Sequence, residues 1–149
     1  MKNFVLATQL KYIKQTINMN LAGISNEESC VSPQSGGSSM NWIMGHLITQ
    51  TVNMYKALGI DSGITNIDKY EELYGRGKPN VNCDNAFDIT EILELYNSTH
   101  DKMMKHLEEN DIDGEENLQT LTVLTFHETY HDGQIGTLRR VLGKDSVIK

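Results

Sequence analysis

Two histidines, His127 and His131, are separated by three residues. Residues four positions apart lie one turn apart on an α-helix, with Cβ atoms about 5–6 Å from each other. Two imidazoles at this separation can bind one divalent ion, each at about 2.0–2.1 Å. The spacing therefore predicts a pair of metal ligands on one helix. A pair of core histidines satisfied by hydrogen bonds is the alternative.

A third histidine, His46, follows Trp42 by one helical turn in another apolar segment. Gly45 stands beside it, and a glycine inside a helix costs about 1 kcal/mol relative to alanine. That cost predicts that another part of the chain approaches closely at Gly45. Taken alone, His46 fits either the boundary of an apolar face or a ligand position. The remaining histidines, His100 and His106, are not one turn apart and are predicted to face solvent.

The segments that carry these histidines are predicted to be helical. Apolar residues recur at three and four positions in four stretches, at about residues 3–22, 39–58, 88–109 and 117–142. Both prolines, Pro33 and Pro79, fall between the stretches. The connector 59–85 is longer than an ordinary helix–helix loop, which is typical of a lid or of a loop that carries a short helix. We expect an all-α four-helix bundle in one domain spanning residues 1–149, with this connector between helices two and three.

Polar residues of the last predicted helix fall on its apolar face. That face is predicted from eight residues: Val123, Leu124, Phe126, Tyr130, Ile135, Leu138, Val141 and Leu142. His127, His131 and Gln134 lie within it, so we expect their side chains to point into the bundle. Glu128 lies about 100° round the helix from His127, near the polar edge, where a carboxylate either supports the ligands or is solvated.

The composition argues against several classes of function. The net charge is −7, from 13 basic and 20 acidic residues, which repels phosphate backbones and anionic lipid. We therefore expect no nucleic-acid partner and no membrane partner. The apolar runs are far shorter than the roughly 20 residues of a membrane span, and the first residues do not form a signal-peptide core. Cys30 and Cys83 have no metal-type spacing and are interpreted as reduced thiols with structural or incidental roles, which favours a cytoplasmic protein.

Three runs of sequence suggest a family. The runs WIMGHL (42–47), HETYHDGQI (127–135) and LRRVLG (138–143) occur in this order, and ISNEE (24–28) precedes them. Together they resemble the DinB/YfiT-like superfamily over about residues 1–143. The resemblance implies a four-helix bundle with a three-histidine metal site.

The same resemblance implies the ligands and the class of activity. His46 would come from the second helix, and His127 and His131 from the fourth. Members of the superfamily include metal-dependent transferases and isomerases that use low-molecular-weight thiols, and homodimers are common among them. The implied partners are therefore a small-molecule substrate, a low-molecular-weight thiol and a second copy of the chain.

Elementary coordination chemistry agrees with this implication. Three neutral histidines without a fourth protein ligand leave a position open for water or substrate, as in catalytic sites. Zinc or nickel is the first expectation for the divalent ion, with iron or manganese as alternatives. A thiol bound at such an ion loses its proton and becomes a nucleophile. Gln134, Glu128 and Tyr130 are the candidates for supporting the ligands, Gln134 by orienting one of them and Tyr130 chiefly by packing.

Two other functions remain open on the sequence. His127, Glu128 and His131 fit the His-Glu-x-x-His pattern of zinc hydrolases, in which the glutamate is the general base. Against it, no histidine or glutamate follows His131 to act as a third ligand. The second alternative is a bundle that binds metal without turnover.

Overall fold

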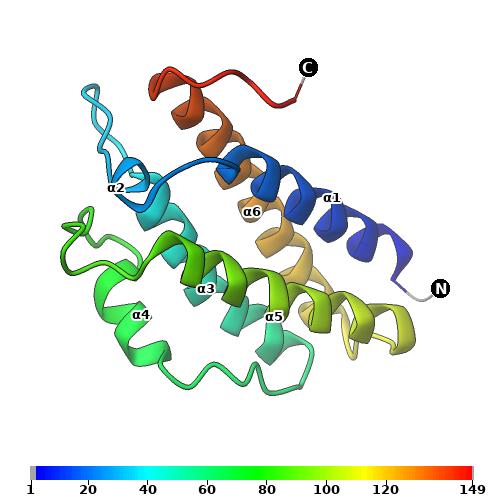
Figure 1. Ribbon diagram of the computed structural model, residues 1–149. Coiled ribbons are helices and arrows are strands. Elements are labelled where there is room, and N and C mark those ends of the chain that lie inside the picture. The colour runs from blue at the N-terminus through cyan, green and yellow to red at the C-terminus, as the bar shows by residue number, and fades with distance from the viewer. Residues whose placement is uncertain (1–2, 149) are drawn as a thin grey trace.

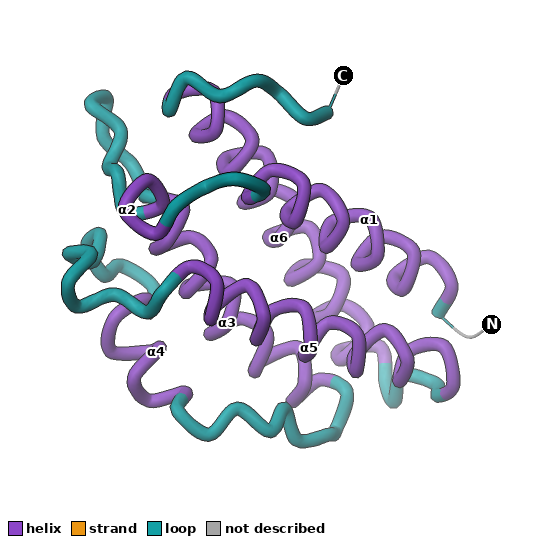
Figure 2. The backbone as a smooth tube through the Cα atoms, viewed as in Figure 1, coloured by secondary structure: helices purple, strands orange, loops and turns teal. Residues whose placement is uncertain are grey.

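The computed structural model describes residues 3–148, and this part of the chain is all-helical (Figure 1). It contains six helices: α1 (Phe4–Leu21), α2 (Asn26–Ser29), α3 (Met40–Ala57), α4 (Ile67–Tyr74), α5 (Ile89–Glu109) and α6 (Glu115–Val141). Loops and turns join them, and no strand occurs among the described residues (Figure 2). The prediction of an all-α class is confirmed.

The four long helices correspond to the four predicted stretches. Both α5 and α6 pack against α1 and against α3. The short helix α4 lies on the connector between α3 and α5 and packs against α3 (Figure 1). A short helix within this connector was one of the two expected outcomes. The other short helix, α2, was not predicted.

Side-chain caps begin α3 and α5, and a glycine follows the end of α3. The hydroxyl of Ser39 accepts a hydrogen bond from the backbone N–H of Trp42 at 3.2 Å, which caps the start of α3. Asp88 does the same for α5 by accepting from the backbone of Thr90 at 2.8 Å. Gly59 follows α3 with a φ angle of 68°, a conformation that glycine adopts without strain.

The first half of α3 is buried on all sides. Every residue from 40 to 49 is buried, whereas a surface helix would present one polar face. The reason is that α4 packs on α3 in addition to α5 and α6. A Cβ atom at Gly45 would overlap the ring of Tyr74, so only glycine allows α4 to lie this close. The close approach predicted from Gly45 is confirmed, and His46 lies inside the protein rather than at a boundary.

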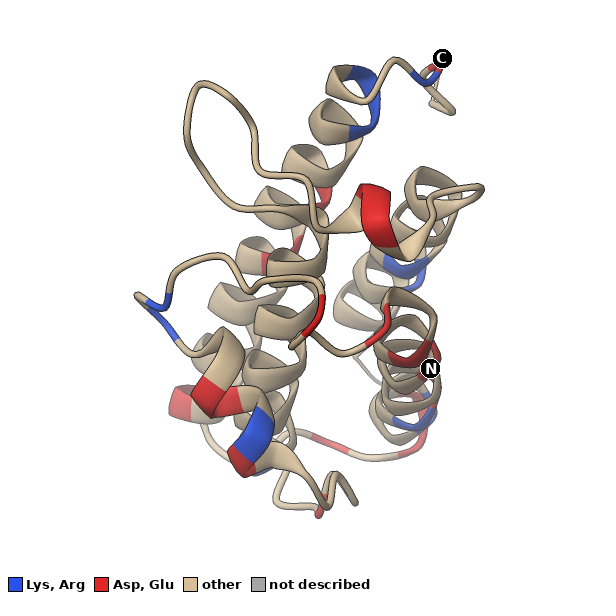
Figure 3. Ribbon diagram, turned by 60° about the vertical axis from the view of Figure 1, so that its left-hand side comes forward, with Lys and Arg blue, Asp and Glu red and all other residues tan. Residues whose placement is uncertain are grey.

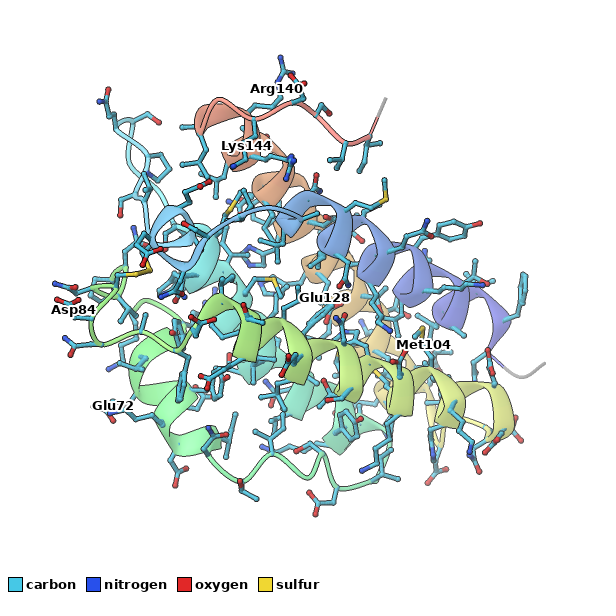
Figure 4. The ribbon with its side chains drawn as sticks, viewed as in Figure 1. Glu72, Asp84, Met104, Glu128, Arg140 and Lys144 are labelled. Carbon is cyan, nitrogen blue, oxygen red and sulfur yellow. A yellow bond between two sulfur atoms is a disulfide. The ribbon has the colours of Figure 1, made fainter. Side chains whose placement is uncertain are left out.

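Cys30 and Cys83 form a disulfide with Cα atoms 5.6 Å apart, so the prediction of two reduced thiols is wrong. Cys30 directly follows α2, and Cys83 lies between α4 and α5 (the yellow bond beside Asp84 in Figure 4). The two residues are 53 positions apart, and their predicted loops give no sign that they meet.

Charged residues are spread over several helices (Figure 3). On α4, for example, Asp68, Glu71 and Glu72 are all exposed. Within residues 3–148, no helix is both long enough and apolar enough to cross a bilayer.

Candidate metal centre

Three histidines from two helices come together inside the protein. His46 lies on α3, and His127 and His131 lie on α6. One nitrogen atom from each ring lies within 4.8 Å of the other two. The ring of His46 is centred 5.3 Å from that of His127 and 5.5 Å from that of His131. These are the three residues predicted as metal ligands.

A backbone carbonyl orients His46. Its Nδ1 lies 3.0 Å from the carbonyl oxygen of Tyr74, the last residue of α4. Because a carbonyl only accepts, Nδ1 carries the hydrogen and the lone pair remains on Nε2. The ring also stacks on Trp42, with the centroids 4.8 Å apart and the planes 11° from parallel. No feature of α4 in the sequence points to Tyr74, although Gly45 indicates that some group approaches there.

A side-chain amide orients His131. Its Nδ1 lies 2.6 Å from Oε1 of Gln134, which again leaves the lone pair on Nε2. The amide nitrogen of Gln134 donates in turn to the hydroxyl of Tyr130 at 3.3 Å. The hydrogen bond between His131 and Gln134 supports the predicted role of Gln134 in orienting a ligand.

The third histidine faces the second at close range. Nε2 of His127 lies 3.1 Å from Nε2 of His131. Two nitrogens bound to one tetrahedral ion at about 2.05 Å lie about 3.3 Å apart, so this separation already suits a shared ion. Nδ1 of His127 is buried without a hydrogen-bond partner in residues 3–148. His127 is therefore the least restrained of the three rings.

Burial favours the neutral form of each imidazole. It lowers the pKa of His131 to about 4, and it lowers the pKa of His46 and His127 below the ordinary value. The charge of Arg76 lowers the pKa of both of the latter further, whereas Glu71 acts in the opposite direction on His46. Neutral imidazole is the form that binds metal ions, so the cluster is ready to do so at neutral pH.

The donor set fits a divalent ion with an open position. The three histidines form the group, and within the described part of the chain no cysteine, aspartate or glutamate joins them as a fourth ligand. Three nitrogen ligands and a vacant site are the arrangement that zinc has in several enzymes.

A groove of ≈ 410 Å³ lies beside Gln134. It is lined by the 33–38 turn and by one face of α6 that includes Tyr130 and Gln134. This volume lies within the range of small-molecule sites. Neither this groove nor a larger hollow of ≈ 1040 Å³ between α1 and α5 is lined by any of the three histidines. The groove is connected to the cluster only through Gln134, which lines it and hydrogen-bonds to Nδ1 of His131.

Glu128 lies in the interior, not at a polar edge of α6 (Figure 4). Its two carboxylate oxygens lie 2.9 and 3.0 Å from Nε2 of His100, and Oε2 lies 3.1 Å from the hydroxyl of Tyr96. His100 is fully buried too, so the prediction that it faces solvent is wrong. Glu128 on α6 and His100 on α5 satisfy each other's hydrogen-bonding groups. The pattern of a single helix cannot reveal such a contact between two helices. Burial and the Glu128 carboxylate together raise the pKa of Tyr96 well above its usual value.

The apolar residues of α6 divide between two faces. Ile135 and Leu138 are buried as predicted. Four others predicted to share their face are exposed: Val123, Phe126, Tyr130 and Val141. The prediction of a single apolar face was wrong because the buried face of α6 carries Thr125, Glu128 and His131 among its aliphatic residues.

The chain matches no protein-family model and no curated protein. The features of the chain that bear on its function are therefore the three histidines and their surroundings.

Proposed function

We propose that the protein binds a divalent metal ion through His46, His127 and His131 and uses it to transfer a low-molecular-weight thiol to a small molecule. One observation carries the metal site. His46 and His131 each donate their Nδ1 hydrogen to a protein oxygen, which leaves Nε2 of both rings without a hydrogen beside His127. Histidine ligands in metal sites are oriented in the same way by their second nitrogen.

We further propose that the fold is a four-helix bundle of the DinB/YfiT-like kind. Its four helices would be α1, α3, α5 and α6, with α4 inserted in the connector. The sequence resemblance supports this, because it implies one histidine from the second long helix and two from the fourth. The histidines lie on α3 and α6, the second and fourth of these long helices.

The proposed chemistry assigns separate tasks to the ion and to the chain. A divalent ion at three neutral ligands would lower the pKa of a bound thiol and so supply a nucleophile at neutral pH. The chain keeps the imidazoles neutral by burial and oriented by Tyr74 and Gln134. We place the substrate in the groove beside Gln134, whose lining includes no charged side chain. The thiol would give its proton to solvent, and the sulfur electron pair would form the new C–S bond as the bond from that carbon to the leaving group breaks; the leaving group departs with its own pair, so no oxidant is needed.

The three histidine ligands indicate which metal ions the site suits. Imidazole ligands suit zinc, nickel and iron, and three of them with an open position suit zinc especially. We propose zinc or nickel, with iron or manganese as alternatives.

Two measurements test the proposal. Elemental analysis of untagged protein, after incubation with zinc or nickel and desalting, is expected to give about one ion per chain. His46→Ala and His127→Ala should each abolish binding, whereas His106→Ala, which alters a histidine of α5 outside the cluster, should not. Conjugation of bacillithiol, mycothiol or glutathione to a chlorobimane then tests turnover. A metal-free wild type refutes the metal site; a full site without turnover favours a binding protein.

The hydrolase alternative finds no support in the surroundings of Glu128. A general base must reach the water that it activates. The carboxylate of Glu128 is fully buried and its oxygens are engaged by His100 and Tyr96. We therefore do not propose peptide hydrolysis.

We propose a homodimer that forms through the exposed apolar face of α6. Phe126 is 73% exposed, and Val123 and Tyr130 are more than half exposed. Large apolar side chains gathered on one helix face are typical of an interface. Sedimentation velocity of the purified protein tests this directly.

A further inference from the structure

Gln134 connects the proposed metal centre to the groove beside it through a chain of hydrogen bonds. Its Oε1 lies 2.6 Å from Nδ1 of His131, and its amide nitrogen lies 3.3 Å from the hydroxyl oxygen of Tyr130. Both Gln134 and Tyr130 line the groove, whereas His131 does not. Tyr130 is also 59% exposed. The chain therefore ends at a hydroxyl group that belongs to the lining of the groove.

An ion at Nε2 of His131 fixes the direction of both hydrogen bonds in this chain. Nδ1 must then carry the ring's single N–H hydrogen, and Oε1 of Gln134 accepts it. The amide nitrogen of Gln134 can only donate, so the hydroxyl oxygen of Tyr130 accepts from it. The hydroxyl hydrogen of Tyr130 consequently points away from Gln134, and within residues 3–148 it has no acceptor.

The other lining residues indicate what kind of molecule would supply that acceptor. They include no charged side chain, so a carboxylate or a phosphate would find no cationic partner among them. The hydroxyl of Thr137 donates to the carbonyl oxygen of Gly133 at 3.1 Å and is already used. Three residues give the groove its apolar surface: Pro33, Leu138 and Val141. An uncharged molecule with an apolar body and an oxygen acceptor fits this lining.

The wall of the groove formed by the 33–38 turn is held in place by Asn80. The side chain of Asn80 accepts from the backbone N–H of Ser39 at 2.8 Å. Its amide nitrogen donates to the carbonyl oxygen of Gly37 and to the hydroxyl of Ser32, both at 2.9 Å. These bonds fasten the turn at both of its ends, so the groove is formed before a ligand arrives, as most small-molecule sites are.

We infer that Tyr130 selects the substrate by donating its hydroxyl hydrogen to a carbonyl or ether oxygen of an uncharged, partly apolar molecule in the groove. The inference rests on the proposed function, because the ion at His131 sets the direction of the chain. Tyr130 touches the substrate, and Gln134 is a positioning residue that acts through it. The groove shares only Tyr130 with the proposed dimer face, since neither Val123 nor Phe126 lines it.

The first test compares two uncharged bicyclic probes on the zinc-loaded protein. Tetramethyl syn-bimane carries carbonyl oxygens and no leaving group, and naphthalene carries no acceptor. Tyr130→Phe removes only the hydroxyl, so the bimane should bind about three- to tenfold more weakly, whereas naphthalene should bind equally well. Fluorescence titration measures both dissociation constants. Tyr12→Phe, which alters an exposed tyrosine of α1 outside the groove, is the matched control with no change expected.

A second variant, Gln134→Glu, tests the direction of the chain. One carboxylate oxygen would accept from Nδ1 of His131 and the other from the hydroxyl of Tyr130, which turns that hydrogen away from the groove. Zinc should still bind, because a carboxylate is a common partner of a ligating histidine. The bimane should bind to Gln134→Glu as weakly as to Tyr130→Phe. The double variant should bind it no more weakly than either single variant.

The outcomes separate this inference from the proposed function. If the wild type binds no zinc, the metal site is refuted, and the inference with it. If the zinc-loaded wild type binds no bimane, or Tyr130→Phe binds it as tightly as the wild type, the donor role of Tyr130 is refuted while the metal site stands. If Tyr130→Phe weakens the binding of bimane and naphthalene equally, Tyr130 only shapes the groove, which overturns the inference. If Gln134→Glu binds the bimane as tightly as the wild type, the direction of the chain is refuted.

Discussion

Substituting Gly45 by alanine tests the packing that positions His46. In an unobstructed helix, glycine to alanine stabilises by about 1 kcal/mol. At Gly45 the new methyl group would overlap the ring of Tyr74. Forcing an extra methyl group into a packed core costs about 1–3 kcal/mol. The sign of the net effect therefore depends on whether the ring can move.

The hydrogen bonds of Tyr74 decide that question. Its hydroxyl donates to Oδ1 of Asn41 at 3.0 Å and accepts from the backbone of Phe87 at 2.9 Å. Moving the ring would disturb both bonds, each worth about 0.5–1.5 kcal/mol. We therefore place the cost at the upper end, about 3 kcal/mol, and expect Gly45→Ala to lower the free energy of unfolding by about 2 kcal/mol.

A matched control is available on α6. A Cβ at Gly133 would meet nothing within 4 Å, so Gly133→Ala should stabilise by about 0.5–1 kcal/mol. Urea unfolding of the metal-free proteins, followed by circular dichroism, measures both variants. Because the carbonyl of Tyr74 accepts from His46, Gly45→Ala should also weaken zinc binding, whereas Gly133→Ala should not weaken it as strongly. If Gly45→Ala is as stabilising as Gly133→Ala, the close packing of α4 on α3 is refuted.

Three further predictions concern other parts of the chain. The pKa of His131 is about 4 in the folded protein against 6.5 unfolded, so its neutral form contributes stability that is lost as pH falls from about 6.5 to 4. Over this range the free energy of unfolding of the metal-free wild type should fall by on the order of 3 kcal/mol more than that of His131→Gln. Urea titrations at several pH values measure both proteins, and equal losses would contradict the shift. The Cys30–Cys83 disulfide closes 53 residues, so Cys30→Ser/Cys83→Ser should lower the free energy of unfolding by about 2–4 kcal/mol, and an insensitivity of the wild type to reductant would argue against the bond. Phe126→Asp should convert a dimer to a monomer in sedimentation velocity while the protein stays helical by circular dichroism, because the side chain is exposed in the monomer, and a monomeric wild type refutes that interface.

The sequence predicts features that arise within a single helix. Apolar spacing locates the four long helices to within a few residues. Gly45 signals a close approach through its cost to the helix, and the approaching group is Tyr74. The two-histidine spacing selects His127 and His131 on α6, and the family resemblance adds His46 from another helix; the three lie together in the fold.

Features that depend on contact between two distant segments could not be predicted from the sequence. Glu128 and His100 are each polar, and each alone resembles a solvated residue; only their contact across two helices explains their burial. The apolar face of α6 was misjudged because hydrophobicity alone does not reveal whether a side chain is buried or exposed. Phe126 and Ile135 are both large and apolar, yet one is exposed and the other buried.

The disulfide has a consequence for cleavage of the chain. Residues 30–83 form a covalent ring that contains all of α3 and α4, and His46 with them. A protease that cuts once in the exposed stretch before α4 would open this ring without releasing a fragment. The nicked protein would keep its mass in a non-reducing gel and separate into two pieces only after treatment with a thiol reductant.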